Sequence, residues 1–173
     1  ADALTYPLDD FDCIWASPPC QGYSVMRHLP WNRHKDYPLL IAPTRERLKA
    51  WAAEKPGRYW IIENVEGAQR AMPERSGAYL CGTMFGKRFY RHRLFETNFL
   101  WLAPLHETHR HVILGSRLIA GRARTIVFGA AENPPGRSHA ARAEMGIGWM
   151  TRDELSQAVP PCYAKYLAGW IPP

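Results

Sequence analysis

The sequence has no long hydrophobic run, no Cys-x-x-Cys pair and no charged-then-apolar leader at its start. The first absence argues against a membrane-spanning helix, which needs about 20 consecutive apolar residues. The second argues against a zinc site built on paired cysteines, and the third against secretion and therefore against disulfide bonds. We expect a cytoplasmic protein with no membrane partner and no metal cofactor, whose four cysteines are free thiols.

The composition favours a folded chain with a modest basic excess. Of the 173 residues, 46% are hydrophobic, which is enough for one domain with a buried core. Lysine and arginine number 22 against 16 acidic residues, so the net charge is +6. This charge is compatible with a nucleic-acid partner, and equally with an ordinary basic surface.

The first third of the chain has the pattern of a strand, a helix and a second strand. The apolar run Phe11–Ala16 predicts a buried strand. A helix is predicted over Pro43–Glu54 with Thr44 as its cap, and the next strand over Tyr59–Ile62. This βαβ order predicts a parallel sheet covered by helices. Within it, Cys13 is expected to be a buried structural thiol.

The rest of the chain is less regular. Further strands are predicted over Leu80–Phe85 and Leu94–Leu102. A basic stretch over 97–143 has weak periodicity and reads as an insertion, with short strands predicted over 112–114 and 125–128. A capping box at Thr151–Glu154 predicts a short helix, and Pro160-Pro161 opens a last one.

Three groups of reactive side chains stand next to predicted strands. Pro18-Pro19 cannot continue the first strand, so the chain turns and presents Cys20 at the strand end. Glu63 follows the second strand, and Arg91-His92-Arg93 precedes a later one. Taken singly, each has an ordinary explanation: a buried thiol, a solvated carboxylate and surface charge. Their order and their positions beside strands favour one common site.

Such a set of groups suits an attack on a cytosine ring. Carbon 5 of cytosine becomes nucleophilic only when a group such as a thiolate adds to carbon 6. A carboxyl group at ring N3 and a guanidinium at O2 would stabilise the charge that develops. Cys20, Glu63 and Arg93 offer these three functions.

The ordered motifs resemble those of the DNA (cytosine-5) methyltransferases, in particular the compact phage and bacterial members. The motifs are Pro18-Pro19-Cys20-Gln21-Gly22-Tyr23-Ser24, Glu63-Asn64-Val65, Leu80–Gly86 with Arg91-His92-Arg93, Met145-Gly146-Ile147, and Gln157-Ala158-Val159-Pro160-Pro161. The resemblance implies an α/β, Rossmann-like S-adenosylmethionine-dependent methyltransferase fold with a small basic target-recognition insertion. It implies double-stranded DNA as the partner, in a restriction-modification or phage setting.

The resemblance also implies roles for single residues. Cys20 would add to carbon 6, Glu63 would bind N3 and Arg93 would contact O2 of a base flipped out of the duplex. Arg91 would support the site and Asn64 would brace the catalytic loop, while 22–40 would close over the DNA. The remaining implied contacts are with the substrate, from Pro19, Gln21 and Ser24, and with the cofactor, from Asp2, Pro18 and Gln157.

The resemblance divides the chain into a partial catalytic domain over 1–96, a target-recognition region over 97–143 and a C-terminal return over 144–173. The family's Gly-rich cofactor turn has no counterpart in the sequence, and the closing motif usually has Asn where this chain has Gln157. We therefore expect an N-terminally incomplete fold, with the missing cofactor-binding segment upstream or on a partner chain. Two alternatives stay open: a catalytically inactive or split-enzyme DNA-binding subunit, and an RNA cytosine-5 methyltransferase.

Overall fold

The computed structural model describes residues 2–30, 32, 34–74, 79–87, 89–106 and 137–173. The chain forms two compact units. Unit 1 comprises Ala1–Tyr79, His92–Leu102 and Trp170–Pro173, and unit 2 comprises Leu80–Arg91 and Ala103–Gly169. The short strands predicted over 112–114 and 125–128 lie outside the described residues, and so does most of the predicted recognition region.

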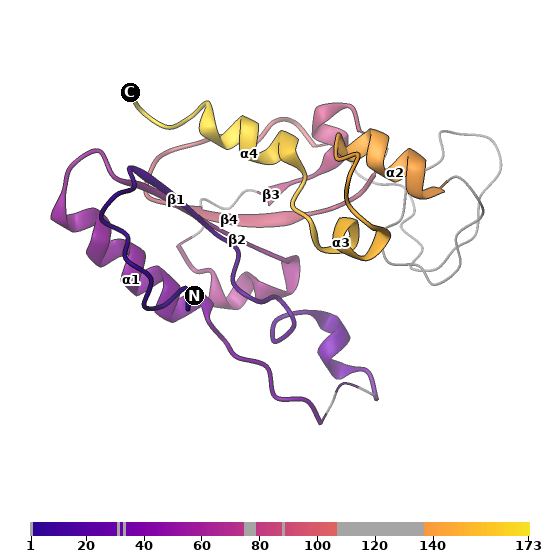
Figure 1. Cartoon of the computed structure of the whole chain (residues 1–173), viewed down its shortest axis with the longest axis horizontal. Helices are drawn as coiled ribbons and strands as arrows, with labels where there is room; N and C mark the ends of the chain where they lie inside the picture. The colour runs from indigo at the N-terminus through magenta and orange to yellow at the C-terminus, as the bar shows by residue number, and fades with distance from the viewer. Residues whose placement is uncertain (1, 31, 33, 75–78, 88, 107–136) are drawn as a thin grey trace. The chain divides into compact units, whose positions relative to one another are not determined.

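The strands form one mixed sheet in the order β1-β2-β4-β3 (Figure 1). They are β1 Cys13–Ala16, β2 Tyr59–Asn64, β3 Tyr79–Leu80 and β4 Arg93–Thr97. The strands β1 and β2 are parallel, as predicted, but β4 is antiparallel to β2, so the expectation of a parallel sheet was wrong for this strand. A parallel neighbour needs a crossover that returns the chain to the opposite edge, usually through a helix. In the described part between β2 and β4 the chain makes only 3-10 turns and the short β3.

The helix α1, Ile41–Glu54, packs along one face of the β1–β2 pair (Figure 1). Its buried Leu48 and Trp51 share a hydrophobic cluster with Trp60 and Ile62 of β2. Burying such side chains contributes about 1.5–3 kcal/mol each. The helix was predicted, but the cap was wrong: Leu40 is the N-cap, and the Thr44 amide already donates to the Leu40 carbonyl oxygen at 3.1 Å inside the first turn.

The strand boundaries differ from the predictions wherever a turn competes with the apolar pattern. The predicted strand over Leu80–Phe85 is only two residues of β3, followed by a 3-10 helix, Gly82–Phe85. Gly82 lies so close to Phe89 that an added Cβ atom would be 2.4 Å from the ring. A residue with a side chain could not pack in this way, so the position requires glycine. The strand β4 ends at Thr97, whose hydroxyl donates to the Phe99 carbonyl oxygen at 2.6 Å.

Cys13 is exposed, which corrects the expectation of a buried thiol. It is the first residue of β1, and β1 is an edge strand, so neighbours cover Cys13 on fewer sides than a central strand would allow. The partial burial that remains raises the pKa of the Cys13 thiol from its ordinary value.

Unit 2 contains the helices α2 Arg137–Met145, α3 Arg152–Gln157 and α4 Pro161–Ala168. The predicted capping box is confirmed, because the Thr151 hydroxyl accepts from the Glu154 amide while the Glu154 carboxylate accepts from the Thr151 amide. Leu155, Tyr163 and Leu167 are buried. Among the helices that the structure describes, none combines the length and the apolar character needed to cross a membrane.

Candidate active site

The reactive groups of unit 1 gather at one edge of the sheet. Because β1 and β2 are parallel, both strands end at this edge. Cys20 follows the end of β1, and Glu63 is the last but one residue of β2. Because β4 is antiparallel to β2, it begins at the same edge, with Asn64 paired to Leu94 and Glu63 to Phe95. The reversed strand therefore brings Arg93 to the edge where the other two motifs lie.

Glu63 and Arg93 form an ion pair on the sheet. The Arg93 Nε atom is 2.8 Å from the Glu63 Oε1 atom, and the two side chains are 15% and 6% exposed. Arg93 is two residues from Phe95, the strand partner of Glu63, so the two side chains are diagonal neighbours on one face. Arg93 also donates from Nη1 to the His92 carbonyl oxygen at 2.8 Å. The pair presents a carboxylate and a guanidinium in fixed relative positions.

Asn64 ties the end of β2 to the segment that carries the cysteine. Its side-chain amide donates to the Pro18 carbonyl oxygen at 2.9 Å, and its Oδ1 accepts from the Val65 amide at 3.0 Å. Asn64 is 1% exposed, so both bonds are shielded from water. A buried amide satisfied on both sides holds Pro18, two residues before Cys20, against the strand end.

Cys20 lies in a hydrogen-bonded turn. Its carbonyl oxygen accepts from the amides of Tyr23 and Ser24, at 3.0 and 2.9 Å. The cysteine is half-buried rather than fully exposed. Its neighbours Pro19 and Gln21 are exposed, which leaves one side of the turn open to a large substrate.

His92 and Glu66 form a contact that sequence reasoning missed. The His92 Nδ1 atom is 3.1 Å from the Glu66 Oε1 atom, and the imidazole packs against the ring of Tyr79 at 4.8 Å between centroids. The contact links the start of β4 to the 3-10 helix Glu66–Ala71. Their positions beside motifs could have indicated the two residues: Glu66 directly follows Glu63-Asn64-Val65, and His92 lies between Arg91 and Arg93.

Two predicted site residues belong to unit 2. Arg91 is buried and donates to the carbonyl oxygens of Leu155 and Ser156, at 3.1 and 2.5 Å, while its own carbonyl accepts from the Tyr163 hydroxyl at 2.6 Å. Arg91 thus ties the end of α3 and the start of α4 to its own segment. Gln157, the last residue of α3, is exposed. The predicted supporting role of Arg91 and the predicted cofactor contact of Gln157 stay predictions.

Two of the residues expected to contact S-adenosylmethionine, Asp2 and Pro18, belong to unit 1. Asp2 is exposed, and its carboxylate accepts from the Leu4 amide at 2.9 Å within its own turn. Pro18 is buried with its carbonyl oxygen bonded to Asn64. The predicted cofactor contacts of Asp2 and Pro18 stay predictions.

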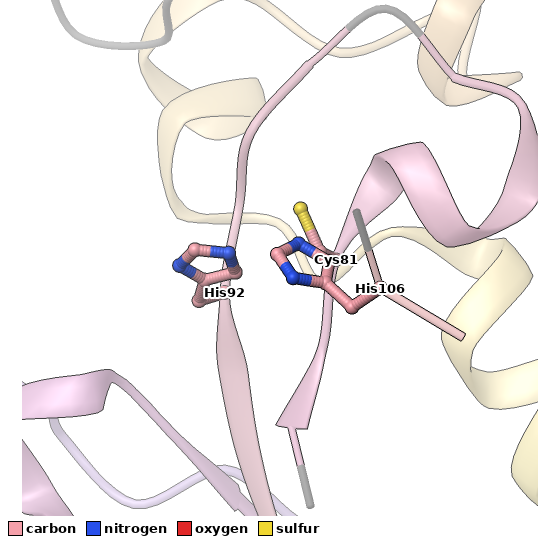
Figure 2. Close-up of side chains that lie close together, drawn as sticks. All are labelled: Cys81, His92 and His106. Carbon is pink, nitrogen blue, oxygen red and sulfur yellow. The ribbon is translucent and has the colours of Figure 1, made fainter. Parts of the chain in front are cut away.

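Cys81 and His106, both in unit 2, bring a thiol and an imidazole close together (Figure 2). Their sulfur and nitrogen atoms lie within 4.8 Å of each other. The Thr83 hydroxyl donates to the Cys81 sulfur at 3.4 Å. His92, the third side chain labelled, belongs to unit 1, where it contacts Glu66. Structural zinc sites use four ligands, so the two groups of unit 2 do not make a site by themselves.

Comparison with known proteins adds no family to these observations: no protein-family model matches the chain, and no curated protein matches it. The edge of the sheet in unit 1 is therefore the feature on which a function can be built.

Proposed function

We propose that this chain activates cytosine in DNA for methylation at carbon 5, with Cys20 as the nucleophile. The observation that carries the proposal is the ion pair between buried Glu63 and partly buried Arg93, at the sheet edge where Asn64 holds the Cys20 segment. A thiol, a carboxylate and a guanidinium are the groups that this chemistry needs, and unit 1 supplies all three from one edge.

The proposed activation is a reversible addition. The Cys20 thiolate forms a bond to carbon 6 of a flipped cytosine, and the electrons of the C5–C6 double bond move towards carbon 5 and the ring atoms N3 and O2. Glu63, protonated from solvent as the base binds, donates a hydrogen bond to N3 and keeps this proton when the adduct breaks down, while Arg93 donates to O2, where negative charge develops. Carbon 5 then accepts an electrophile. Loss of its original hydrogen as a proton, together with the thiolate, restores the ring and the free enzyme.

In the complete reaction S-adenosylmethionine would be the methyl donor. Because the Gly-rich cofactor turn of the family has no counterpart in the sequence, we propose for this chain only the steps that its own side chains perform. A cofactor-binding segment outside these residues, or on a partner chain, would complete the reaction.

The choice of a nucleic acid as substrate has support near the cysteine. Arg27, His28, His34 and Lys35 are exposed in the segment that follows the Cys20 turn. Arg27 and Lys35, together with the net charge of +6, provide cations for phosphate groups. Double-stranded DNA as the natural partner and a cytoplasmic location are part of the proposal.

The activation step can be tested without a methyl donor. When carbon 5 of the adduct takes a proton from water and then loses its original hydrogen, tritium placed at carbon 5 of cytosine is released. We expect the protein to release tritium from DNA labelled in this way, and Cys20→Ser to abolish the release. Cys13→Ser is the matched control, because Cys13 is an exposed thiol on the edge strand β1 and is not in the proposed site.

Each other result has a defined meaning. Equal release by Cys20→Ser and the parent protein would overturn the mechanism. Release from labelled RNA but not from DNA would establish the RNA alternative in place of the proposed substrate. Binding of DNA with no release above that of buffer would leave a DNA-binding subunit and overturn the proposed activity.

A further inference from the structure

The backbone of the 3-10 helix Glu66–Ala71 comes unusually close to the turn that follows Cys20. A Cβ atom added to Gly67 would lie 2.2 Å from the Tyr23 carbonyl oxygen and 3.2 Å from its carbonyl carbon. Real Cβ atoms essentially never approach within 3.0 Å of another heavy atom. The opposing atom belongs to the backbone, so no side-chain rotation relieves the clash. A glycine is required here by the close approach of two backbones.

The other end of Tyr23 is held by α1. The Tyr23 hydroxyl accepts a hydrogen bond from the Ile41 amide at 3.0 Å. Ile41 is the first residue of α1, whose N-cap, Leu40, provides no side-chain cap. The first amides of a helix have no partner within the helix, so the tyrosine hydroxyl satisfies one of them. Tyr23 is thus fixed at its carbonyl by the Gly67 backbone and at its hydroxyl by the helix.

This double restraint reaches the cysteine through the turn. The amides of Tyr23 and Ser24 both donate to the Cys20 carbonyl oxygen, at 3.0 and 2.9 Å. A displacement of Tyr23 away from Gly67 must lengthen these bonds or carry Cys20 with it. Since Asn64 holds the preceding Pro18, the cysteine is restrained on both sides in the chain.

We propose that Gly67 and Tyr23 are positioning residues for the Cys20 thiol. Gly67 acts by having no side chain, which lets its backbone abut Tyr23, and Tyr23 acts by bridging this contact to the start of α1. The catalytic meaning of the proposal rests on the proposed function, while the restraint on the thiol does not. A misplacement of about 1 Å in a reacting group can cost about 10²-fold in rate.

The test compares Gly67→Ala, Tyr23→Phe and Gly148→Ala. Gly148 is the matched control, since an added Cβ there would meet nothing within 4 Å. Cys20 and Cys13 lie in the same tryptic peptide, so iodoacetamide labelling followed by fragment-ion mass spectrometry gives their relative rates. Tritium release at saturating DNA, the Kd for DNA and the circular dichroism spectrum are measured alongside.

In Gly67→Ala we expect tritium release to fall by about 10²-fold while the Kd for DNA changes little. The ratio of Cys20 to Cys13 labelling should rise several-fold, because the loosened turn exposes a thiol that is now half-buried. Tyr23→Phe should change both quantities in the same directions, and Gly148→Ala should change neither. Because Cys13 is already exposed, unfolding of a destabilised protein would also raise this ratio, so the labelling is compared under conditions where circular dichroism and urea unfolding show every variant to be folded.

A parent-like labelling ratio and parent-like release in Gly67→Ala would overturn the proposal. If Gly67→Ala does not fold, Tyr23→Phe decides in the same way. Failure of the proposed function is distinguishable: a parent protein that releases no tritium, but whose labelling ratio responds to the substitutions, refutes the activity and keeps the restraint on Cys20.

Discussion

The Glu63 carboxylate and the Arg93 guanidinium join two neighbouring strands of the sheet, with Oε1 and Nε 2.8 Å apart and both side chains largely shielded from water. An exposed pair of this kind contributes about 0–1 kcal/mol, whereas breaking a buried one leaves a charge without its partner. The proposed site is therefore also a part of the fold that substitutions will destabilise.

Arg93→Gln should destabilise the protein by about 3–5 kcal/mol, because it leaves the Glu63 carboxylate buried beside a neutral group. Urea unfolding followed by circular dichroism measures the change. The double variant Glu63→Gln/Arg93→Gln removes both charges and should recover part of the loss. Tritium release should be absent from both variants, and a single variant as stable as the parent would contradict the prediction.

Asn64→Ala should separate positioning from stability when compared with Asn98→Ala. Both asparagines bond to backbone groups: Asn64 donates to the Pro18 carbonyl, and Asn98 accepts from the Trp60 amide and donates to the Arg58 carbonyl. Each substitution leaves backbone partners unsatisfied at a cost of about 1–3 kcal/mol. Only Asn64→Ala should also lower tritium release. Equal release by the two variants at a temperature where both are folded would refute a role for Asn64 in holding the cysteine segment.

Arg45 and Glu96 form a second buried ion pair, on the α1 side of the sheet. The Arg45 Nε atom is 2.7 Å from Glu96 Oε2, and Glu96 also accepts from the Glu74 amide at 3.0 Å. Glu96→Gln should cost about 3–5 kcal/mol in urea unfolding. Lys49→Ala is the comparison, since it removes an exposed ion pair with the Glu74 carboxylate and should cost less than about 1 kcal/mol. Similar costs for the two variants would mean that burial does not set the energy of the Arg45–Glu96 pair.

The capping box of α3 predicts a dependence of stability on acid. Hydrogen bonds from the Thr151 amide and hydroxyl lower the pKa of the Glu154 carboxyl below its ordinary value of 4.5. A lowered pKa in the folded state stabilises the fold above the unfolded value, and this contribution is lost as the pH falls through the folded value. We expect the urea midpoint of Glu154→Gln to lie below that of the parent at neutral pH and to approach it in acid. If the difference in urea midpoint between the variant and the parent stays constant from neutral pH into acid, ionisation of Glu154 is excluded as its cause.

Part of this structure follows from local sequence signals. The parallel pair β1 and β2, the helix α1 and the capping box of α3 were predicted because each depends on periodicity or on residues close in the chain. The reversed direction of β4 was not, since it depends on a connection without a crossover helix. The sequence also gave no means of locating the helix start at Ile41, where a distant tyrosine hydroxyl takes the place of a side-chain cap.

The candidate site shows the same division. Cys20, Glu63 and Arg93 were predicted from their motifs, and the sheet brings all three motifs to one edge. The contact of His92 with Glu66 and the approach of Gly67 to Tyr23 depend on backbone segments that lie far apart in the chain. Periodic patterns in a sequence report on residues that are close together in the chain, so they do not predict contacts of this kind.

The short strand β4 also constrains which in-frame deletions a gene for this protein would tolerate. Arg93 pairs with Glu63 and Glu96 pairs with Arg45, and the two residues are an odd number of positions apart, so their side chains lie on opposite faces of the strand. Loss of one codon between them would place both side chains on one face and abolish one of the two pairs. Loss of both intervening codons would keep the two side chains on opposite faces. The allele with the two-codon deletion could therefore keep both ion pairs, although the allele with the one-codon deletion has lost one of them.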